Sequence, residues 1–224
     1  RDWFASQAIN LPNLADLLDI VAVGTVADVV SLDKNNRILV HQGLQRIRSG
    51  KCRPGIKAII EVANRQLAYL SASDLGFVVG PRLNAAGRLD DMAMGIACLL
   101  EDDTMQARMM AAELDSLNQQ RREIETGMRE EAMQVVASLT LNTDEVPPAL
   151  VLYKQDFHQG VIGIVAGRIK EQVNRPVIAF AHQDDEVIKG SARSISGIHI
   201  RDVLDEVNPR NPGLIEKFGG HAMA

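Results

Sequence analysis

Cysteine is scarce in this chain of 224 residues, which contains only Cys52 and Cys98. Two cysteines cannot build a disulfide scaffold, and their separation does not match the spacing of zinc ligands. No apolar run is long enough to span a membrane as a helix, and no signal peptide opens the chain. These absences exclude a disulfide-rich secreted domain and favour a reduced, cytoplasmic protein without a membrane partner.

A surplus of positive charge is also lacking. The formal net charge is −5, so any nucleic-acid site has to be local. Residues 147–224 balance nine Lys and Arg against nine Asp and Glu, so the acidic surplus lies upstream. With 46% hydrophobic residues, the chain can bury a core in one large or two small domains. It starts at Arg1 without a methionine, and we expect it to be an internal piece of a longer protein.

The first block, residues 1–103, has a helix-rich pattern. The small and β-branched residues of 24–30 predict a tight turn after a buried element. Ser73 and Asp74 are placed to cap a helix that Gly80-Pro81 would break, and residues 82–88 would then form an ordered loop. Further helices are expected over 38–47, 57–64 and 91–100.

The second block is a single long helix over residues 104–140, since no proline falls between Pro81 and Pro147. A narrow apolar stripe predicts either a helix lying on a core or a rigid connector between domains. The stripe consists of Met110, Leu114, Leu117, Ile124, Met128, Val135 and Leu139.

The third block, residues 147–224, alternates strands and helices. Such alternation predicts an α/β domain with a parallel or mixed sheet. The nearly continuous apolar run of 176–181 is typical of a central strand. The other expected elements are strands over 149–153 and 187–195, helices over 160–173 and 200–207, and a Pro-rich loop over 208–213.

Two glycine-containing segments in this block combine groups that bind anions. Ser191 and Arg193 alternate along a predicted strand with Lys189, so all three face one side. Arginine matches phosphate with a planar fork of donors. Gly190 and Ala192 weaken a strand and need a reason, which favours a phosphate cradle over a solvated edge strand. His221 follows Gly219 and Gly220 and could bind phosphate or donate a proton, although a lone histidine is more often structural.

Other candidates keep two readings open. Asp28 could bind Mg²⁺ or Mn²⁺, but the residues alone favour a helix N-cap. Arg82, Asn84 and Arg88 could contact phosphate, or the arginines could form ion pairs with nearby carboxylates. His158 precedes Gly160 at a predicted helix start, where free amides form an anion site; the alternative is a glycine needed only for the turn.

Five segments in this order resemble the RecJ family of single-strand-specific exonucleases, in the DHH phosphoesterase superfamily. They are Gly24-Thr-Val-Ala-Asp-Val-Val, Gly80-Pro-Arg-Leu-Asn-Ala-Ala-Gly-Arg, His158-Gln-Gly-Val-Ile-Gly, Lys189-Gly-Ser-Ala-Arg-Ser and Phe218-Gly-Gly-His. The resemblance implies that 1–103 is the rear of a DHH catalytic domain and 104–140 an interdomain helix. It also implies that 147–224 is a DHHA1 substrate-binding domain, truncated at its C-terminal end.

The resemblance also implies residue roles. Asp28 corresponds to a metal ligand, Arg82 and Arg88 to arginines of the cleft, Ser191 and Arg193 to phosphate-binding residues, and His221 to a histidine beside the scissile bond. The implied cofactors are two Mn²⁺ or Mg²⁺ ions. The Asp-His-His triplet, the earlier aspartates and an oligonucleotide-binding domain are absent, so we expect this piece alone to be inactive.

The function implied is 5′-to-3′ hydrolysis of single-stranded DNA to mononucleotides in DNA repair and recombination. The implied partners are single-stranded DNA, a single-strand-binding protein and a recombination helicase. Two alternatives remain: a DHH phosphodiesterase or pyrophosphatase acting on short oligonucleotides or cyclic dinucleotides, and a non-catalytic replication scaffold.

Overall fold

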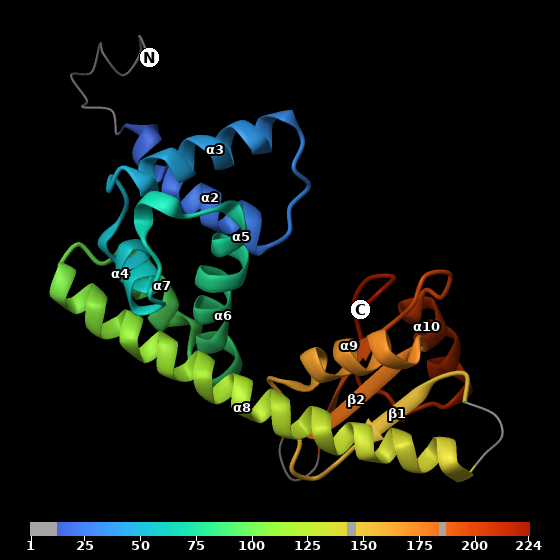
Figure 1. Ribbon diagram of the computed structural model, residues 1–224. Helices are drawn as coiled ribbons and strands as arrows, with labels where there is room; N and C mark the ends of the chain where they lie inside the picture. Colours follow the sequence, from blue (N-terminus) through green and yellow to red (C-terminus); the bar gives the residue numbers. More distant parts are fainter. Residues whose placement is uncertain (1–12, 143–146, 184–186) are drawn as a thin grey trace. The chain divides into compact units, whose positions relative to one another are not determined.

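The computed structural model describes residues 13–142, 147–183 and 187–224, and it divides the chain into two compact units. Unit 1 is Arg1–Gln119 and unit 2 is Gln120–Ala224. The described part of unit 1 is helical, whereas unit 2 contains a sheet, as Figure 1 shows. The expected combination of a helix-rich part, a long helix and an α/β part is therefore confirmed.

Unit 1 is built from short helices around a core of aliphatic side chains. Ile47, Ile56, Ile59 and Leu75 are fully buried in it. The elements are η1 (Leu14–Leu17), α2 (Leu18–Ala27), α3 (Lys34–Arg48), α4 (Pro54–Val62), η2 (Leu67–Tyr69), α5 (Ala72–Asp74), η3 (Leu75–Val79), α6 (Gly80–Leu89), α7 (Met92–Leu100) and the first part of α8 (Thr104–Asn142).

Side-chain caps define where several of these helices begin. Asp33 accepts a hydrogen bond from the Asn36 amide at the start of α3. Ser71 and Asp74 form a reciprocal capping box, so the cap lies at Ser71 rather than at the expected Ser73-Asp74 pair. Each such cap satisfies backbone donors that a helix start leaves without a partner.

The expected break at Gly80-Pro81 is wrong, because the helix continues through it. Residues Leu75–Val79 form a wider π-helical turn, in which the Gly80 amide donates to the Leu75 carbonyl. Pro81 follows in the first turn of α6, where a missing N–H is tolerated. Residues 82–88 are therefore helical rather than an ordered loop.

Helix α8 belongs to both units. It buries Ala107, Ala111 and Leu114 in unit 1, and Met128 and Val136 in unit 2. The expected stripe holds at Leu114 and Met128, but Val135 is 42% exposed and its neighbour Val136 is buried instead. The helix therefore lies on a core along part of its length in each unit.

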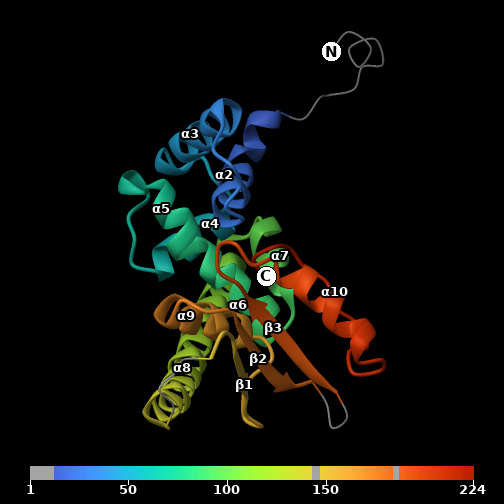
Figure 2. The ribbon, with the colours of Figure 1, turned by 90° about the vertical axis from the view of Figure 1, so that its right-hand side faces the viewer.

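Unit 2 contains a three-stranded mixed sheet in the order β1 (Leu150–Tyr153), β2 (Val177–His182), β3 (Ile188–Arg193), side by side in Figure 2. β1 and β2 are parallel, whereas β2 and β3 are antiparallel. The prediction of a central strand over 176–181 is confirmed by β2. Helix α9 (Ile162–Val173) packs on the face that carries the buried Val177, Ala179 and Ala181.

Helix α10 (Ile200–Arg210) extends farther than expected. The sequence predicts a loop from residue 208 onward, but Pro209 lies inside the helix. Proline removes one backbone donor, yet its fixed φ is helical, so the last turn continues past it. The loop begins only after Arg210.

The two cysteines are free, and burial is the main cause that raises the pKa of each thiol to about 11. Both thiols are therefore protonated at neutral pH. Within the described residues, no helix is long and apolar enough to cross a membrane.

Candidate nucleic-acid site

Strand β3 places Ser191 and Arg193 on the face of the sheet that α9 covers. Ser191 pairs with Ala179 and Arg193 with Val177, and both partners are fully buried. Lys189 follows the same alternation, opposite Ala181. The prediction that these three donors share one side is therefore confirmed in the geometry of the strand.

Gly163, in the first turn of α9, lies directly against this pair. A Cβ atom at Gly163 would be 2.9 Å from both Arg193 Nη2 and Ser191 Oγ, too close without movement of those side chains. At Gly167, one turn later, a Cβ would be 4.0 Å from Arg193 Cγ, an ordinary contact. The absence of a side chain at Gly163 thus lets both polar groups reach the beginning of the helix.

The Arg193 guanidinium is only partly satisfied by the protein. Its Nη1 donates to the Ala192 carbonyl at 2.6 Å and to Ser191 Oγ at 3.2 Å. Burial lowers the pKa of Arg193 from its ordinary value, and none of the ion pairs among the described residues involves it. A partly desolvated guanidinium without a carboxylate beside a helix N-terminus is suited to bind an anion.

His158 organises the turn that precedes α9. Its Nδ1 accepts a hydrogen bond from the Gly160 amide at 3.1 Å, and its carbonyl accepts from the amides of Val161 and Ile162. Because Nδ1 is an acceptor, the neutral ring carries its proton on Nε2, which remains a donor. Gly160 therefore shapes the turn, whereas the amides of Gly160, Val161 and Ile162 already donate to His158. An anion site at this helix start stays a prediction.

The segment Gly219-Gly220-His221 lies near the end of β3. The Ser194 amide donates to the Met223 carbonyl at 2.9 Å, and the Ile200 amide donates to the Ala222 carbonyl at 3.0 Å. Gly220 has φ = 146°, which strongly favours glycine. The structure therefore brings the two glycine-containing segments of the sequence together.

Gly190 has a structural role that the sequence did not reveal. It faces Phe180 across the β2–β3 pair, and a Cβ there would be 2.6 Å from the ring. This face is opposite to the one that carries Ser191 and Arg193. Packing of the Phe180 ring explains this glycine, so Gly190 itself is not an argument for a phosphate cradle.

In unit 1, Asp28 is the C-cap of α2, so the N-cap reading is wrong. Its amide bonds to the Gly24 carbonyl at 3.0 Å, whereas its side chain is exposed and has no hydrogen bond or ion pair among the described residues. The next residue, Val29, has φ = 54°, a left-handed conformation that costs an L-residue about 1–2 kcal/mol. The exposed carboxylate of Asp28 therefore lies on a turn that a backbone hydrogen bond holds in place and whose next residue is strained.

Arg82 points away from the other two polar residues of α6, Asn84 and Arg88. Arg82 donates through Nε to Asp115 Oδ1 of α8 at 2.8 Å and through Nη1 to the Val78 carbonyl at 2.8 Å. The Arg82 and Asp115 side chains are only 11% and 16% exposed. The ion-pair reading thus applies to Arg82, although the partner is Asp115, which sequence spacing gives no means to identify.

Asn84 and Arg88 lie four residues apart and share an exposed face of α6. Gly80, four residues before Asn84, contacts the end of α2, since a Cβ there would be 3.1 Å from Ala27 Cβ. The face of α6 that carries Asn84 and Arg88 therefore begins at a contact with the end of α2.

Asp28 fits a hard cation as one oxygen ligand, but it cannot hold an ion alone. Across residues 13–142, 147–183 and 187–224, no group of three or more His, Cys, Asp or Glu is arranged to bind a metal. The remaining ligands of any metal site at Asp28 have to come from elsewhere.

Unit 2 is matched by a family model, the DHHA1 domain, over residues 125–224. Two curated relatives, both named single-stranded-DNA-specific exonuclease RecJ, are 60% identical: one from Dickeya dadantii over 99% of this chain and one from Escherichia coli over 100%. The chain belongs to the RecJ family. It spans 38% and 39% of the lengths of these two relatives.

Solved RecJ structures share the fold. RecJ from Thermus thermophilus in complex with Mg²⁺ has a TM-score of 0.80 at 33% identity, over 95% of this chain and 31% of that one. A RecJ exonuclease bound to manganese has a TM-score of 0.76 at 33% identity, over 97% of this chain and 51% of that one. RecJ proteins therefore bind divalent metals, as the resemblance implied.

Proposed function

We propose that this chain is part of a metal-dependent exonuclease that degrades single-stranded DNA from the 5′ end to mononucleotides. The observation that carries the proposal is Arg193, a partly buried guanidinium without a carboxylate partner among the described residues, which lies with Ser191 against the start of α9. Similarity to RecJ over nearly the whole chain supports the substrate class.

In this proposal the residues of unit 2 hold the strand. Ser191 and Arg193 bind a backbone phosphate, and the His158 Nε2–H donates to the same strand. His221, beside the end of β3, lies near the bond that is cleaved. Because these contacts are made to phosphate, they hold the strand without reading its sequence.

In unit 1, Asp28 supplies one ligand for Mn²⁺ or Mg²⁺, and Asn84 and Arg88 orient the strand beside it. When bound, a pair of such ions activates water and stabilises the charge on the phosphate. The other ligands belong to the part of the complete protein outside this chain. We also propose a cytoplasmic role in repair and recombination, with a single-strand-binding protein and a recombination helicase as partners.

The test compares the complete protein with this 224-residue piece on a single strand labelled at the 5′ or the 3′ end. We expect the complete protein with Mn²⁺ to release labelled mononucleotides from the 5′ end first, and EDTA to stop the release. We expect no digestion by the piece, because it lacks the other ligands. Mononucleotide release from the 3′ end first, or robust Mn²⁺-dependent digestion by the piece, would contradict the proposal.

A further inference from the structure

Within the described part of unit 1, helices α2, α3 and α4 end in the same hydrogen-bonded turn. In α3, the Gly50 amide donates to Ile47 and the Lys51 amide to Arg46. In α4 the corresponding donors are Asn64 and Arg65, and in α2 they are Val29 and Val30, at 3.2 and 3.1 Å from the Val26 and Thr25 carbonyls. Each is a Schellman turn, which requires one residue in the left-handed conformation.

The residue in that position differs sharply among these turns. Gly50 and Asn64, with φ of 76° and 56°, are the types that tolerate the conformation. Val29 adopts φ = 54° although its branched Cβ makes it one of the least suited residues. The strain at Val29 therefore has no counterpart in the other two turns.

No packing in the described part of the chain compensates for this strain, since Val29 is 88% exposed. A glycine or asparagine would make the same two hydrogen bonds without the strain. What valine adds is an apolar side chain, directly after the exposed carboxylate of Asp28. Residues in such sparsely populated conformations cluster at active sites and ligand-binding sites.

We propose that Val29 is a strand-contact residue, whose side chain packs against the sugar or base of an unpaired nucleotide held at the end of α2. The inference rests on the proposed function. The position of Val29 supports this: its apolar side chain follows directly on the exposed carboxylate of Asp28, the ligand proposed for a metal ion beside the strand. A nucleotide offers apolar ring faces against which such a side chain can pack.

The experiment measures binding of a fluorescent single strand to the complete protein in EDTA, so that neither metal nor cleavage contributes. We expect Val29→Gly to weaken binding about fivefold to tenfold, the effect of losing one apolar side-chain contact. Val29→Ile, which keeps a branched apolar group, should retain parental affinity. Asn64→Gly is the matched control, because it changes the same position of a remote Schellman turn and should leave affinity unchanged.

Thermal unfolding of the same variants separates contact from packing. Relief of strain offsets the greater freedom of glycine in the unfolded chain, so Val29→Gly should unfold within about 3 °C of the parent. If the unfolding temperature of Val29→Gly fell by more than this while strand affinity stayed unchanged, the inference would be overturned, because other parts of the protein would then be shown to cover Val29. Unchanged affinity and unchanged unfolding would overturn it as well.

The outcome is separable from that of the proposed function. If the complete protein releases mononucleotides but Val29→Gly binds the strand like the parent, only this inference fails. If the complete protein neither degrades nor binds a single strand, the proposed function fails first.

Discussion

Arg82 in unit 1 and Arg193 in unit 2 are both partly buried arginines, but their surroundings differ. Arg82 is neutralised by Asp115 of α8 and also donates to a backbone carbonyl. Among the described residues, Arg193 bonds only to Ser191 and the Ala192 carbonyl, and burial lowers its pKa. The charge of Arg82 is therefore neutralised within the fold, whereas the charge of Arg193 remains available to a ligand.

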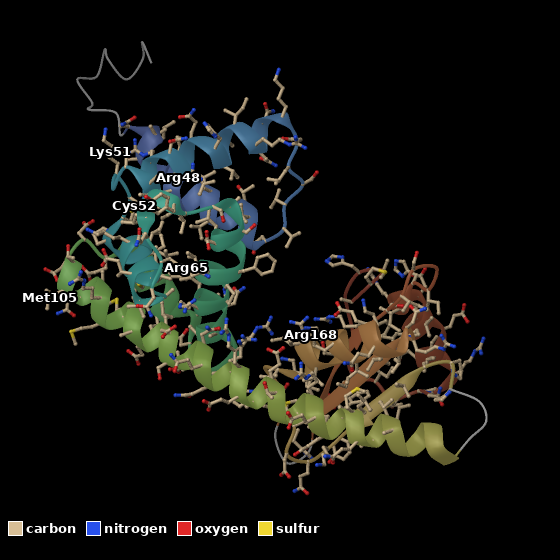
Figure 3. All side chains as sticks on the ribbon, viewed as in Figure 1. Arg48, Lys51, Cys52, Arg65, Met105 and Arg168 are labelled. Carbon is tan, nitrogen blue, oxygen red and sulfur yellow. The ribbon has the colours of Figure 1, made fainter. Side chains whose placement is uncertain are left out.

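The difference shows that burial of an arginine does not by itself indicate a binding site. Arg168 on α9 (Figure 3) differs from both arginines. It has a carboxylate nearby, because its Nε lies 3.6 Å from Glu125 Oε1 of α8, but most of its side chain is exposed and therefore hydrated. What distinguishes Arg193 is desolvation without a carboxylate in the described part of the chain, together with a neighbouring helix start.

The largest effect should come from breaking the Arg82–Asp115 pair. Asp115→Leu leaves a mostly buried guanidinium without its counter-charge, so we expect the free energy of unfolding of the complete protein to fall by about 3–5 kcal/mol. Chemical denaturation measures this value. Strand binding by the folded variant should stay close to that of the parent.

The double variant Arg82→Met, Asp115→Leu is the control for that result. Replacing both charges with apolar side chains removes the uncompensated charge, so most of the lost stability should return. If strand affinity dropped sharply in the double variant while stability returned, Arg82 would belong to the binding surface and its contrast with Arg193 would disappear.

The second effect in size concerns the contact between Gly163 and the Ser191–Arg193 pair. Gly163→Ala displaces flexible side-chain ends rather than backbone, so we expect strand affinity to fall about tenfold or more, the equivalent of about 1.4 kcal/mol, with little loss of stability. Fluorescence anisotropy at fixed salt measures it. Gly167→Ala, on the same helix one turn later, should bind like the parent; equal losses in both variants would refute the contact.

The sequence predicted unit 2 better than unit 1, and particular residues show why. Alternation along a strand is a local rule, so the shared face of Ser191 and Arg193 followed from their spacing. The partner of Arg82 lies 33 positions away on another helix, and no local rule connects the two. The helix continues through Pro81 because of a π-helical turn, which the pattern of residues does not predict.

The prediction that Asp28 is a helix N-cap was wrong for a related reason. An aspartate before two valines suggested the start of a helix, whereas α2 extends through Gly24 and ends at Ala27. A glycine would have marked that end, as Gly50 marks the end of α3. The left-handed residue is Val29 instead. The tight turn expected over 24–30 is therefore confined to the residues after Ala27, and nothing in the sequence indicates where the helix ends.

The smallest effect should distinguish geometry from charge at Arg193. Arg193→Lys keeps the positive charge but loses the planar fork, so we expect strand affinity to fall only about threefold to tenfold, with an unchanged dependence on salt. Arg193→Ala removes one phosphate contact and should lower the slope of log K against log salt by about one. Titrations of a labelled strand at several salt concentrations measure both.

Arg82→Lys is the control for these variants. It should leave strand affinity and the salt slope unaltered, because that position faces Asp115 rather than a strand. A salt slope that changes in the Arg82 variant and not in the Arg193 variants would reverse the assignment of the two arginines.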